Sequence, residues 1–485
     1  MRLRKLLMNF ECLSVKGNID TEISAIVYDS NKVTPGALFV CLKGLRFDGH
    51  QFAQEAVKQG AKALIVEDIP EFTTNAAIIQ VADTRKALAY FSALWFGYPA
   101  EKMKMIGITG TKGKTTASHM MKGILEEAGY KVGMIGTLGA YIGEERIPTA
   151  NTTPESYELH SLFEQMRKSG CSYVVMEASS QGFKQKRTEG IIFDYGVFLN
   201  ISPDHIAPGE HDNFQEYLDC KRMLVRQSKK ILINRDTQHW DEVTKSVEKP
   251  FLFSLKMTAD LTADNIENIW EQGRIGSSFS VYGGYEGKIS LNLPGVYNVE
   301  NALAAIGIAY MEKIKFSAVS SALSQITVKG RTQVIKETSH FSTFIIDYAH
   351  NALSMENLLV MLKDYHPRRL ICLFGGGGNR SKQRRLDMGR IAGKYADLSI
   401  ITTDNPRMEK VESINNDIIK GINSSNGNYE IILDREKAIH YLIDNCKKDD
   451  IIALIGKGHE EYQEIKGQKY YFSEKKIIEQ YLEKK

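Results

Sequence analysis

Short apolar runs recur along the chain and alternate with segments of helical periodicity, such as residues 52–60. The runs are continuous, as expected of central parallel strands that are covered on both faces. They lie at residues 37–42, 63–66, 103–108, 173–176, 195–199, 230–234, 343–347, 370–374 and 398–402. This order of strands and helices predicts an α/β fold built from doubly wound parallel sheets.

The length of 485 residues predicts more than one hydrophobic core. The turn at residues 96–99 (Phe-Gly-Tyr-Pro) precedes the second group of strands, and Gly330-Arg331 precedes the third. We therefore expect three domains, at residues 1–100, 101–329 and 330–485. The sequence has no repeat of solenoid period and no low-complexity tract.

The composition argues against several classes of partner. A net charge of +3 with scattered lysines lacks the basic stripe of a nucleic-acid-binding protein, and no apolar segment is long enough to span a bilayer. The basic and apolar start, residues 1–10, has too short an apolar run for a signal peptide. Six widely spaced cysteines without a Cys-x-x-Cys pair are typical of reduced, mostly buried thiols. We expect a cytoplasmic protein that binds neither nucleic acid nor membrane.

Residues 107–116, Gly-Ile-Thr-Gly-Thr-Lys-Gly-Lys-Thr-Thr, contain the most informative motif of the chain. They follow an apolar strand and lead into a helix predicted at residues 117–128. Such a loop directs backbone N–H groups toward a phosphate, and the helix N-terminus adds a positive dipole end. Lys114 can reach the outer phosphates and Thr115 can bind Mg²⁺, so we predict a nucleoside triphosphate site. The loop departs from the strict Walker pattern, which has glycine where this chain has Ile108.

Polar clusters also follow three of the predicted strands. They occupy residues 177–182, 200–205 and 347–351. Because ligands bind at the carboxyl ends of strands in parallel sheets, we expect a functional site there. Glu177 and His205 are candidates to hold Mg²⁺ beside Thr115, and Glu177 is the better candidate because Mg²⁺ prefers oxygen ligands.

The run Gly110-Thr111-Lys112-Gly113-Lys114-Thr115 resembles the phosphate loop of the Mur ligases, the ATP-dependent amide-forming enzymes of peptidoglycan precursor synthesis. The resemblance covers nearly the whole chain and is strongest to the members that add the third residue of the stem peptide. It implies three domains, which hold a UDP-sugar, ATP and the incoming amino acid in chain order. It also implies a monomeric bacterial enzyme that uses two Mg²⁺ ions and joins a diamino acid to UDP-N-acetylmuramoyl-L-alanyl-D-glutamate.

The resemblance also implies which residues bind the substrates. Residues 28–40 resemble the uridine-binding start, with contacts from Ser30 and from the backbone near residues 45–47. The implied muramoyl-peptide contacts are Ser30, Asn151, Thr152, Thr153, Ser179, Gln185 and Arg187. The implied ATP contacts are Gly110, Thr111, Lys112, Gly113, Lys114, Thr115, Thr116, Asn298, Asn301, Arg331, Asp347 and His350. The implied catalytic residues are Lys114, Glu177, His205 and Lys221, and the implied metal ligands are Thr115, Glu177, His205 and Lys221 as its carbamate.

Lys221 aligns with the lysine that is carbamylated in the family. The modification replaces an ammonium with an anionic oxygen ligand, which plain lysine cannot supply to a second Mg²⁺ ion. By spacing alone, Lys221 is better explained as a solvated charge on a helix. Only the resemblance reverses that interpretation.

The C-terminal block contains the residues that bear on the incoming amino acid. Asp404-Asn405-Pro406-Arg407 is similar to the motif with which family members bind the second carboxylate of meso-diaminopimelate, and a guanidinium suits that carboxylate. In isolation this tetrapeptide is an ordinary strand-to-turn sequence. The amino-acid contacts that the resemblance implies are Arg385, Asp404, Asn405, Pro406, Arg407, Gly456 and Glu460, the last for the distal ammonium.

Two segments depart from the pattern of diaminopimelate-adding members. Residues 203–211, Pro-Asp-His-Ile-Ala-Pro-Gly-Glu-His, and Asn351-Ala352 look more like lysine-adding relatives. We give more weight to Arg407 and Glu460, which would touch the discriminating groups, and we predict meso-diaminopimelate. Lysine, ornithine and lanthionine remain alternatives. More distant interpretations are a folylpolyglutamate synthetase-like ligase and an inactive nucleotide-binding scaffold.

Overall fold

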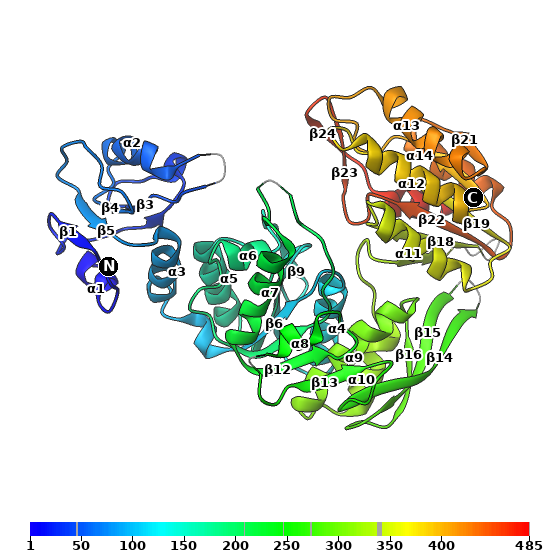
Figure 1. Ribbon diagram of the computed structural model, residues 1–485, viewed down its shortest axis with the longest axis horizontal. Helices are drawn as coiled ribbons and strands as arrows, with labels where there is room; N and C mark the ends of the chain where they lie inside the picture. The colour runs from blue at the N-terminus through cyan, green and yellow to red at the C-terminus, as the bar shows by residue number, and fades with distance from the viewer. Residues whose placement is uncertain (45–46, 208, 246, 272–273, 337–341, 485) are drawn as a thin grey trace. The chain divides into compact units, whose positions relative to one another are not determined.

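The computed structural model describes residues 1–44, 47–207, 209–245, 247–271, 274–336 and 342–484. Packing divides the chain into two compact units, Met1–Asp260 with Ala304–Ile314 and Leu261–Leu303 with Lys315–Lys485. Figure 1 labels the helices and strands of both units. The three domains predicted with boundaries near residues 100 and 330 are a finer division and stay a prediction. Of the uridine contact predicted near residues 45–47, residues 45 and 46 lie outside the described part of the chain.

The first unit begins with a five-stranded sheet in the order β1-β5-β4-β3-β2. Its strands are β1 (Ser14–Lys16), β2 (Ile26–Val27), β3 (Leu38–Val40), β4 (Ala63–Val66) and β5 (Ala77–Gln80), and its helices are α1 (Leu3–Leu7), α2 (Ala53–Lys58) and α3 (Thr84–Trp95). All neighbours pair in parallel except β1 with β5. Leu38 and Ile65 pack with α1 and α3, whereas Phe39 and Leu64 pack with α2. Helices therefore cover both faces, as the continuous apolar runs predicted.

Within the first unit, eight strands of an eleven-stranded sheet have the order β13-β12-β11-β6-β10-β7-β8-β9. These strands are β6 (Lys104–Thr109), β7 (Val132–Gly136), β8 (Gly139–Ile142), β9 (Glu145–Ile147), β10 (Tyr173–Glu177), β11 (Phe193–Phe198), β12 (Ser228–Asn234) and β13 (Phe251–Ser254). The helices of this part are α4 (Lys114–Glu127), α5 (Ser156–Lys168), α6 (Ser180–Lys184), α7 (Phe214–Arg226) and α8 (Trp240–Thr244). The strands from β13 to β7 run parallel, so their carboxyl ends lie at one edge.

The second unit contains three antiparallel strands, β14 (Leu261–Glu271), β15 (Arg274–Tyr282) and β16 (Gly287–Leu291). Its main sheet has the order β17-β18-β22-β19-β20-β21, and only β17 is antiparallel to its neighbour. The strands are β17 (Gln333–Lys336), β18 (Thr343–Asp347), β19 (Arg369–Phe374), β20 (Leu398–Ile401), β21 (Tyr429–Ile431) and β22 (Asp450–Ile455), followed by the hairpin β23 (Tyr462–Ile465) and β24 (Gln468–Tyr471). The helices are α10 (Phe316–Gln325), α11 (Ala352–Lys363), α12 (Lys382–Tyr395), α13 (Val411–Ser424), α14 (Arg435–Asn445) and α15 (Glu474–Leu482), and α9 (Val296–Met311) contributes to both units.

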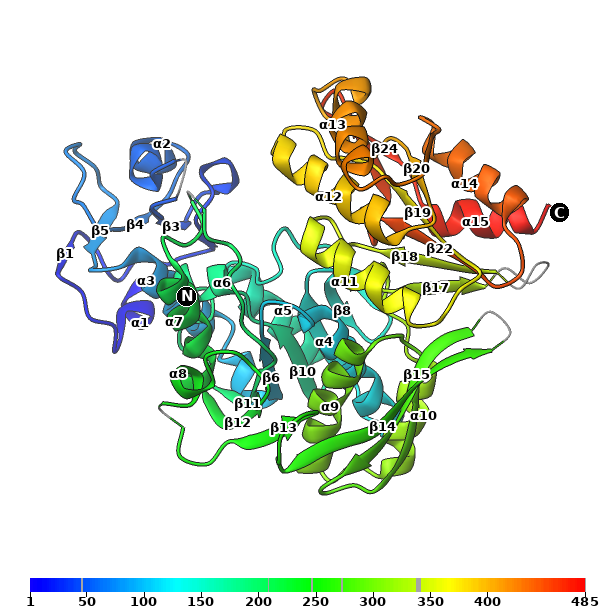
Figure 2. The same cartoon turned by 45° about the vertical axis from the view of Figure 1, so that its right-hand side comes forward.

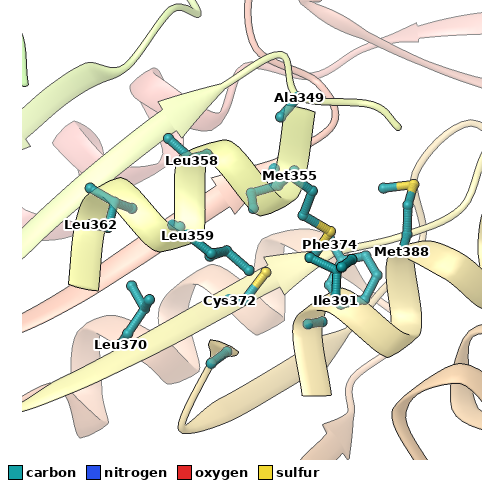
Figure 3. Close-up of a cluster of buried hydrophobic side chains, with 14 of the residues drawn as sticks. Ala349, Met355, Leu358, Leu359, Leu362, Leu370, Cys372, Phe374, Met388 and Ile391 are labelled. Carbon is teal, nitrogen blue, oxygen red and sulfur yellow. The ribbon is translucent and has the colours of Figure 1, made fainter. Parts of the chain in front are cut away.

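Helices cover both faces of this six-stranded sheet (Figure 2). Cys372 and Phe374 of β19 pack with α11 and α12, and Figure 3 shows Leu359 and Met388 in the same cluster. Leu373, between those two strand residues, packs instead with α14 and α15. The alternation of buried residues toward two helical layers confirms the predicted doubly wound α/β fold.

The cysteines agree with a further prediction. All six cysteines are free thiols, and Cys41, Cys171, Cys372 and Cys446 are buried. Of the helices that the structure describes, none has the length and apolar character needed to cross a membrane.

His160, on α5, makes the stability of the fold depend on pH. Its ring is 3% exposed, and within the described residues neither ring nitrogen has a hydrogen-bond partner. Burial lowers the pKa of His160 from 6.5 to about 4. Between these limits the unfolded chain binds a proton that the folded chain does not, so stability falls as the pH is lowered, by about 3 kcal/mol in total.

His160→Leu should remove this contribution, because leucine binds no proton in either state. The difference in unfolding free energy between wild type and variant, measured by chemical denaturation, should change between pH 6.5 and 4 and be constant at higher pH. A difference that is independent of pH in that window would contradict the prediction.

Candidate active site

The phosphate loop, Gly110–Gly113, joins β6 to α4 at the carboxyl edge of the sheet. Ile108, where the strict Walker pattern has glycine, is a buried residue of β6, so the loop begins only after Thr109. Gly113 has a φ of +86°, a conformation that favours glycine, and it is the N-cap of α4. The first turn of α4 therefore directs its backbone N–H groups and Lys114 toward this edge.

Asn200, in the segment after β11, holds the phosphate loop in place. Its side-chain oxygen accepts a hydrogen bond from the Lys112 N–H at 2.9 Å, and its amide donates to the Lys112 carbonyl at 3.2 Å. The Thr111 hydroxyl lies 3.0 Å from the Tyr217 hydroxyl. The sequence predicts Asn200 at the end of a strand and assigns it no role. The neighbouring positions of β11 and β6 in the sheet bring Asn200 to the loop.

Two lysine side chains converge on one carbonyl oxygen of the loop. Lys114 Nζ and Lys221 Nζ each donate to the Gly110 carbonyl at 2.8 Å. Lys221 comes from α7 and is 1% exposed, so its interpretation as a solvated helix charge is wrong. The spacing of charges along α7 could not reveal that Lys221 is buried, because its contact is with Gly110 of the phosphate loop, a distant part of the chain.

Burial lowers the pKa of Lys221 well below its ordinary value, and the neighbouring Lys114 ammonium lowers it further. Asp204 acts in the opposite direction but does not cancel the shift. This shift increases the fraction of Lys221 that is present as the neutral amine, which is a nucleophile, whereas the ammonium is not.

Glu177 is the buried last residue of β10 and lies beside the first turn of α4. Its Oε2 accepts hydrogen bonds from the Thr115 and Thr137 hydroxyls, both at 3.1 Å. Its Oε1 accepts from the Thr137 N–H at 3.0 Å. The carboxylate and the Thr115 hydroxyl thus offer adjacent oxygen atoms, the ligand type that Mg²⁺ prefers. Thr137 was not identified from the sequence.

His205 lies in the segment after β11, and 48% of its side chain is exposed. Its Nδ1 is 3.4 Å from Glu210 Oε1. In the part of the chain that the structure describes, no three His, Cys, Asp or Glu side chains gather in the manner of metal ligands. The predicted metal site at Thr115, Glu177, His205 and Lys221 would therefore need the Thr115 hydroxyl and the Lys221 carbamate as ligands, in addition to Glu177 and His205. This site stays a prediction.

The predicted muramoyl-peptide residues Thr152, Thr153 and Ser179 lie next to Glu177. The Thr153 hydroxyl donates to the Glu177 backbone carbonyl at 2.9 Å and accepts from the Ser179 N–H at 3.0 Å. The Thr152 hydroxyl is 3.1 Å from that of Thr137. These contacts place Thr152 and Thr153 beside Glu177, within the first unit.

Arg187 is buried and already has acceptors for its guanidinium. It donates to Glu155 Oε1 at 2.8 Å, to the Thr153 carbonyl at 2.9 Å and to Gln185 Oε1 at 2.6 Å. Glu155, which the sequence analysis did not identify, compensates its charge. The predicted contact of Arg187 with an anionic substrate stays a prediction. Its observed hydrogen bonds hold Thr153 and Gln185 in place.

In the second unit, the residues predicted to contact the nucleotide gather near the end of β18. The Asn301 amide donates to Asn298 Oδ1 at 3.3 Å, and the Asn298 amide lies 3.4 Å from the Thr332 hydroxyl. Asp347 accepts the Thr332 N–H at 2.7 Å. Burial raises the pKa of Asp347, and the nearby Arg331 opposes that shift.

Three predicted contact residues lie nearer the surface. Asn151 and His350 are exposed, and Ser30 is half-buried at the start of the short 3₁₀ helix Ser30–Lys32. His350 Nδ1 is 3.0 Å from the Tyr348 carbonyl oxygen.

The predicted amino-acid residues gather at the carboxyl edge of the six-stranded sheet, in the segments after β20 and β22. The Asn405 amide donates to Glu460 Oε2 at 2.8 Å, and Asn405 Oδ1 accepts from Lys457 Nζ at 3.0 Å. Lys457 is fully buried and lies 3.2 Å from Asp404 Oδ1, yet the sequence analysis missed it. A Cβ on Gly456, whose φ is +112°, would lie 3.3 Å from Asp404 Oδ2, so glycine keeps this carboxylate close to the segment.

Arg407 and Arg385 differ in how they are paired. Arg407 donates through Nη1 to the Gly378 carbonyl at 2.7 Å and through Nε to Glu464 Oε2 at 3.3 Å. Arg385 is buried between two carboxylates, Glu409 at 2.8 Å and Asp417 at 3.3 Å. Arg385 therefore links Glu409 and Asp417 within the protein. Its contact with the amino acid stays a prediction.

Comparison with known proteins identifies the family. Three family models match in chain order: Mur ligase family, catalytic domain (residues 22–95), Mur ligase middle domain (108–309) and Mur ligase, glutamate ligase domain (330–458). A UDP-N-acetylmuramoyl-L-alanyl-D-glutamate–2,6-diaminopimelate ligase of Clostridium perfringens is 39% identical over 100% of both chains. The chain belongs to the Mur ligase family. Mur ligases are ATP-dependent enzymes that form amide bonds.

Other relatives agree with this assignment. A ligase of the same description from Caldanaerobacter subterraneus is 40% identical and covers 99% of each chain. A solved structure of a UDP-N-acetylmuramoyl-L-alanyl-D-glutamate–2,6-diaminopimelate ligase matches with a TM-score of 0.73 and 27% identity, over 100% of this Mur ligase and 99% of that chain.

Gly136 leaves the room that Glu177 needs in this Mur ligase, because a Cβ there would lie 2.2 Å from Glu177 Oε1. Gly136→Ala should displace the carboxylate, cost about 1–3 kcal/mol of stability and lower ATP turnover. Thermal unfolding and phosphate release measure the two effects. Gly129→Ala is the control. Its φ of +88° makes alanine destabilising, but nothing lies within 4 Å of the added Cβ, so it should lose stability and keep its turnover. Wild-type turnover in folded Gly136→Ala would contradict the prediction.

Proposed function

We propose that this Mur ligase joins meso-diaminopimelate to UDP-N-acetylmuramoyl-L-alanyl-D-glutamate with ATP, the step that adds the third residue of the stem peptide. The observation that carries the proposal is the cluster of Asp404, Asn405, Arg407 and Glu460 at one sheet edge. The distal end of meso-diaminopimelate has both a carboxylate and an ammonium, so it needs partners of both charges. The names of the full-length relatives support the same substrates.

The reaction has two chemical steps. An oxygen of the free D-glutamyl carboxylate attacks the γ-phosphorus of ATP, an O–P bond forms, the bond to the β,γ-bridging oxygen breaks, and ADP leaves. The product of this first step is an acyl phosphate. The amine of the diamino acid then attacks the acyl carbon of that intermediate. A C–N bond forms, the C–O bond to phosphate breaks, and one amine proton is released.

Charge compensation and positioning are the main tasks of the protein, because the attacking carboxylate and the phosphates repel each other. The N–H groups of the phosphate loop and Lys114 would bind the β- and γ-phosphates. Asn298, Asn301, Arg331, Asp347 and His350 would contact the rest of the nucleotide. Ser30, Asn151, Thr152, Thr153, Ser179, Gln185 and Arg187 would hold the UDP-muramoyl-peptide.

The donor atoms of the first unit fit Mg²⁺, since Thr115 and Glu177 offer adjacent oxygens. We expect them, with His205 and carbamylated Lys221, to hold two Mg²⁺ ions, which would add positive charge beside the phosphates. Carbamylation is the addition of neutral Lys221 Nζ to CO₂, with formation of an N–C bond and release of a proton. The lowered pKa of Lys221 supports this step, because only the neutral amine reacts.

We infer that the enzyme acts in the bacterial cytoplasm as a monomer, without nucleic-acid or membrane partners. Its domains at residues 1–100, 101–329 and 330–485 would bind the UDP-sugar, ATP and the amino acid, respectively.

Phosphate release with UDP-N-acetylmuramoyl-L-alanyl-D-glutamate and a panel of amino acids tests the proposal. The panel contains meso-diaminopimelate, L-lysine, L-ornithine and lanthionine, and we expect the highest kcat/KM with meso-diaminopimelate. A higher value with lysine would replace the substrate, and amide formation on a folate instead of the muramoyl-peptide would replace the activity. Nucleotide binding without phosphate release would identify an inactive scaffold.

A further inference from the structure

Lys457 is a fully buried lysine that the proposed reaction does not use. Its ammonium donates to the Tyr462 carbonyl at 2.7 Å and to Asn405 Oδ1 at 3.0 Å. It lies 3.2 Å from Asp404 Oδ1 and 4.0 Å from Glu460 Oε2. A buried ammonium is costly unless it is paired and hydrogen-bonded, and here its partners are the residues expected to bind the amino acid.

The contacts of Lys457 decide which way the Asn405 amide points. Asn405 Oδ1 accepts two hydrogen bonds, from Lys457 Nζ and from the Glu464 N–H, both at 3.0 Å. Only the amide oxygen can accept them, so the amide nitrogen faces Glu460 and donates to its Oε2 at 2.8 Å. Lys457 thereby fixes Asn405, and Asn405 fixes Glu460.

Lys457 also offsets a repulsion between two carboxylates. Burial and the charge of Asp404 raise the pKa of Glu460, and the Lys457 ammonium acts against that rise. Asp404 and Glu460 both lie within 4.0 Å of Lys457 Nζ. Without this ammonium, Glu460 would be less charged and less firmly oriented toward an incoming ammonium.

We propose that Lys457 is a positioning residue that sets the preference for a diamino acid. It orients the Asn405 amide and, through that amide, Glu460, and so favours a substrate with a distal ammonium without touching that substrate itself. This inference rests on the function proposed above.

The test compares steady-state kinetics of the wild type, Lys457→Met and Lys469→Met. Methionine keeps much of the buried volume and removes the charge and the donors. We expect the KM for meso-diaminopimelate to rise by about tenfold or more in Lys457→Met, with unchanged KM values for ATP and the UDP-substrate. Lys469 is the matched control, because it is exposed on β24 of the neighbouring hairpin and its Nζ lies 4.2 Å from the Tyr462 ring.

Asn405→Asp tests the same relay if Lys457→Met does not fold. Aspartate keeps both acceptor contacts and loses the donor toward Glu460, so we expect a raised KM for meso-diaminopimelate that recovers partly as the pH is lowered. An unchanged KM in either folded variant, or equal rises for all three substrates, would overturn the proposal. A wild type without diamino-acid-dependent phosphate release would refute the proposed function and this inference with it, whereas an active wild type with unaltered variants refutes only the role of Lys457.

Discussion

Replacing Lys221 with alanine should lower kcat by about a hundredfold to a thousandfold, the usual loss when one charge-stabilising group is removed from an active site. Lys221 is buried, and its Nζ lies 2.8 Å from the Gly110 carbonyl. The alanine variant cannot form the carbamate, so the oxygen ligand expected from α7 would be missing. Phosphate release at saturating substrates gives kcat, and ¹³C NMR of the folded wild type in ¹³C-labelled bicarbonate detects the carbamate.

A short carboxylic acid such as acetate should restore part of the activity of Lys221→Ala. It would fit the space left by the side chain and present the missing oxygen atoms beside Lys114. Lys229→Ala is the matched control, because that lysine is 63% exposed and pairs only with Asp194 at 2.8 Å among the described residues. Full activity of Lys221→Ala without added acid would reject the carbamate role.

The strands and the phosphate loop could be predicted because each depends on a local pattern. Apolar runs predicted strands at residues 63–66 and 343–347, and β4 and β18 have the same bounds. The run at 37–42 was too long, since only Leu38–Val40 form ladder pairs. The helix expected at 117–128 begins at Lys114, because the first turn of α4 includes the loop residues that follow Gly113.

The contacts between distant segments could not be predicted in this way. Asn200 binds Lys112 across 88 positions of the chain, and Lys457 binds Asn405 across 52. Each pair depends on which strands are neighbours, a property that periodicity does not contain. The order of β11 beside β6, once known, places Asn200 at the phosphate loop.

The charges of the site show a second limit of sequence reasoning. A motif identifies a cation but not the anion that pairs with it in the fold. Arg187 pairs with Glu155, and Arg385 pairs with Glu409 and Asp417. Arginines that resemblance assigns to substrates can therefore serve the protein itself, and kinetics must separate the two roles.

Arg407→Ala should raise the KM for meso-diaminopimelate by about tenfold to a hundredfold, because a charge-assisted hydrogen bond to a carboxylate is lost. The KM for L-lysine should change much less, since lysine has no distal carboxylate. Arg407 has a φ of +51°, and alanine carries the same Cβ, so the substitution adds no new backbone strain. The KM for ATP should stay at the wild-type value.

Arg407→Lys and Arg390→Ala complete this experiment. Lysine keeps the charge without the planar fork, so its KM for meso-diaminopimelate should lie between those of the wild type and Arg407→Ala. Arg390 lies on α12 with about half of its side chain exposed, and its loss should change no KM value.

If Arg407→Ala keeps the wild-type KM for meso-diaminopimelate, the carboxylate must bind elsewhere and the specificity assignment is wrong. If the KM values for lysine and meso-diaminopimelate rise equally, Arg407 shapes the cluster instead of recognising the distal carboxylate.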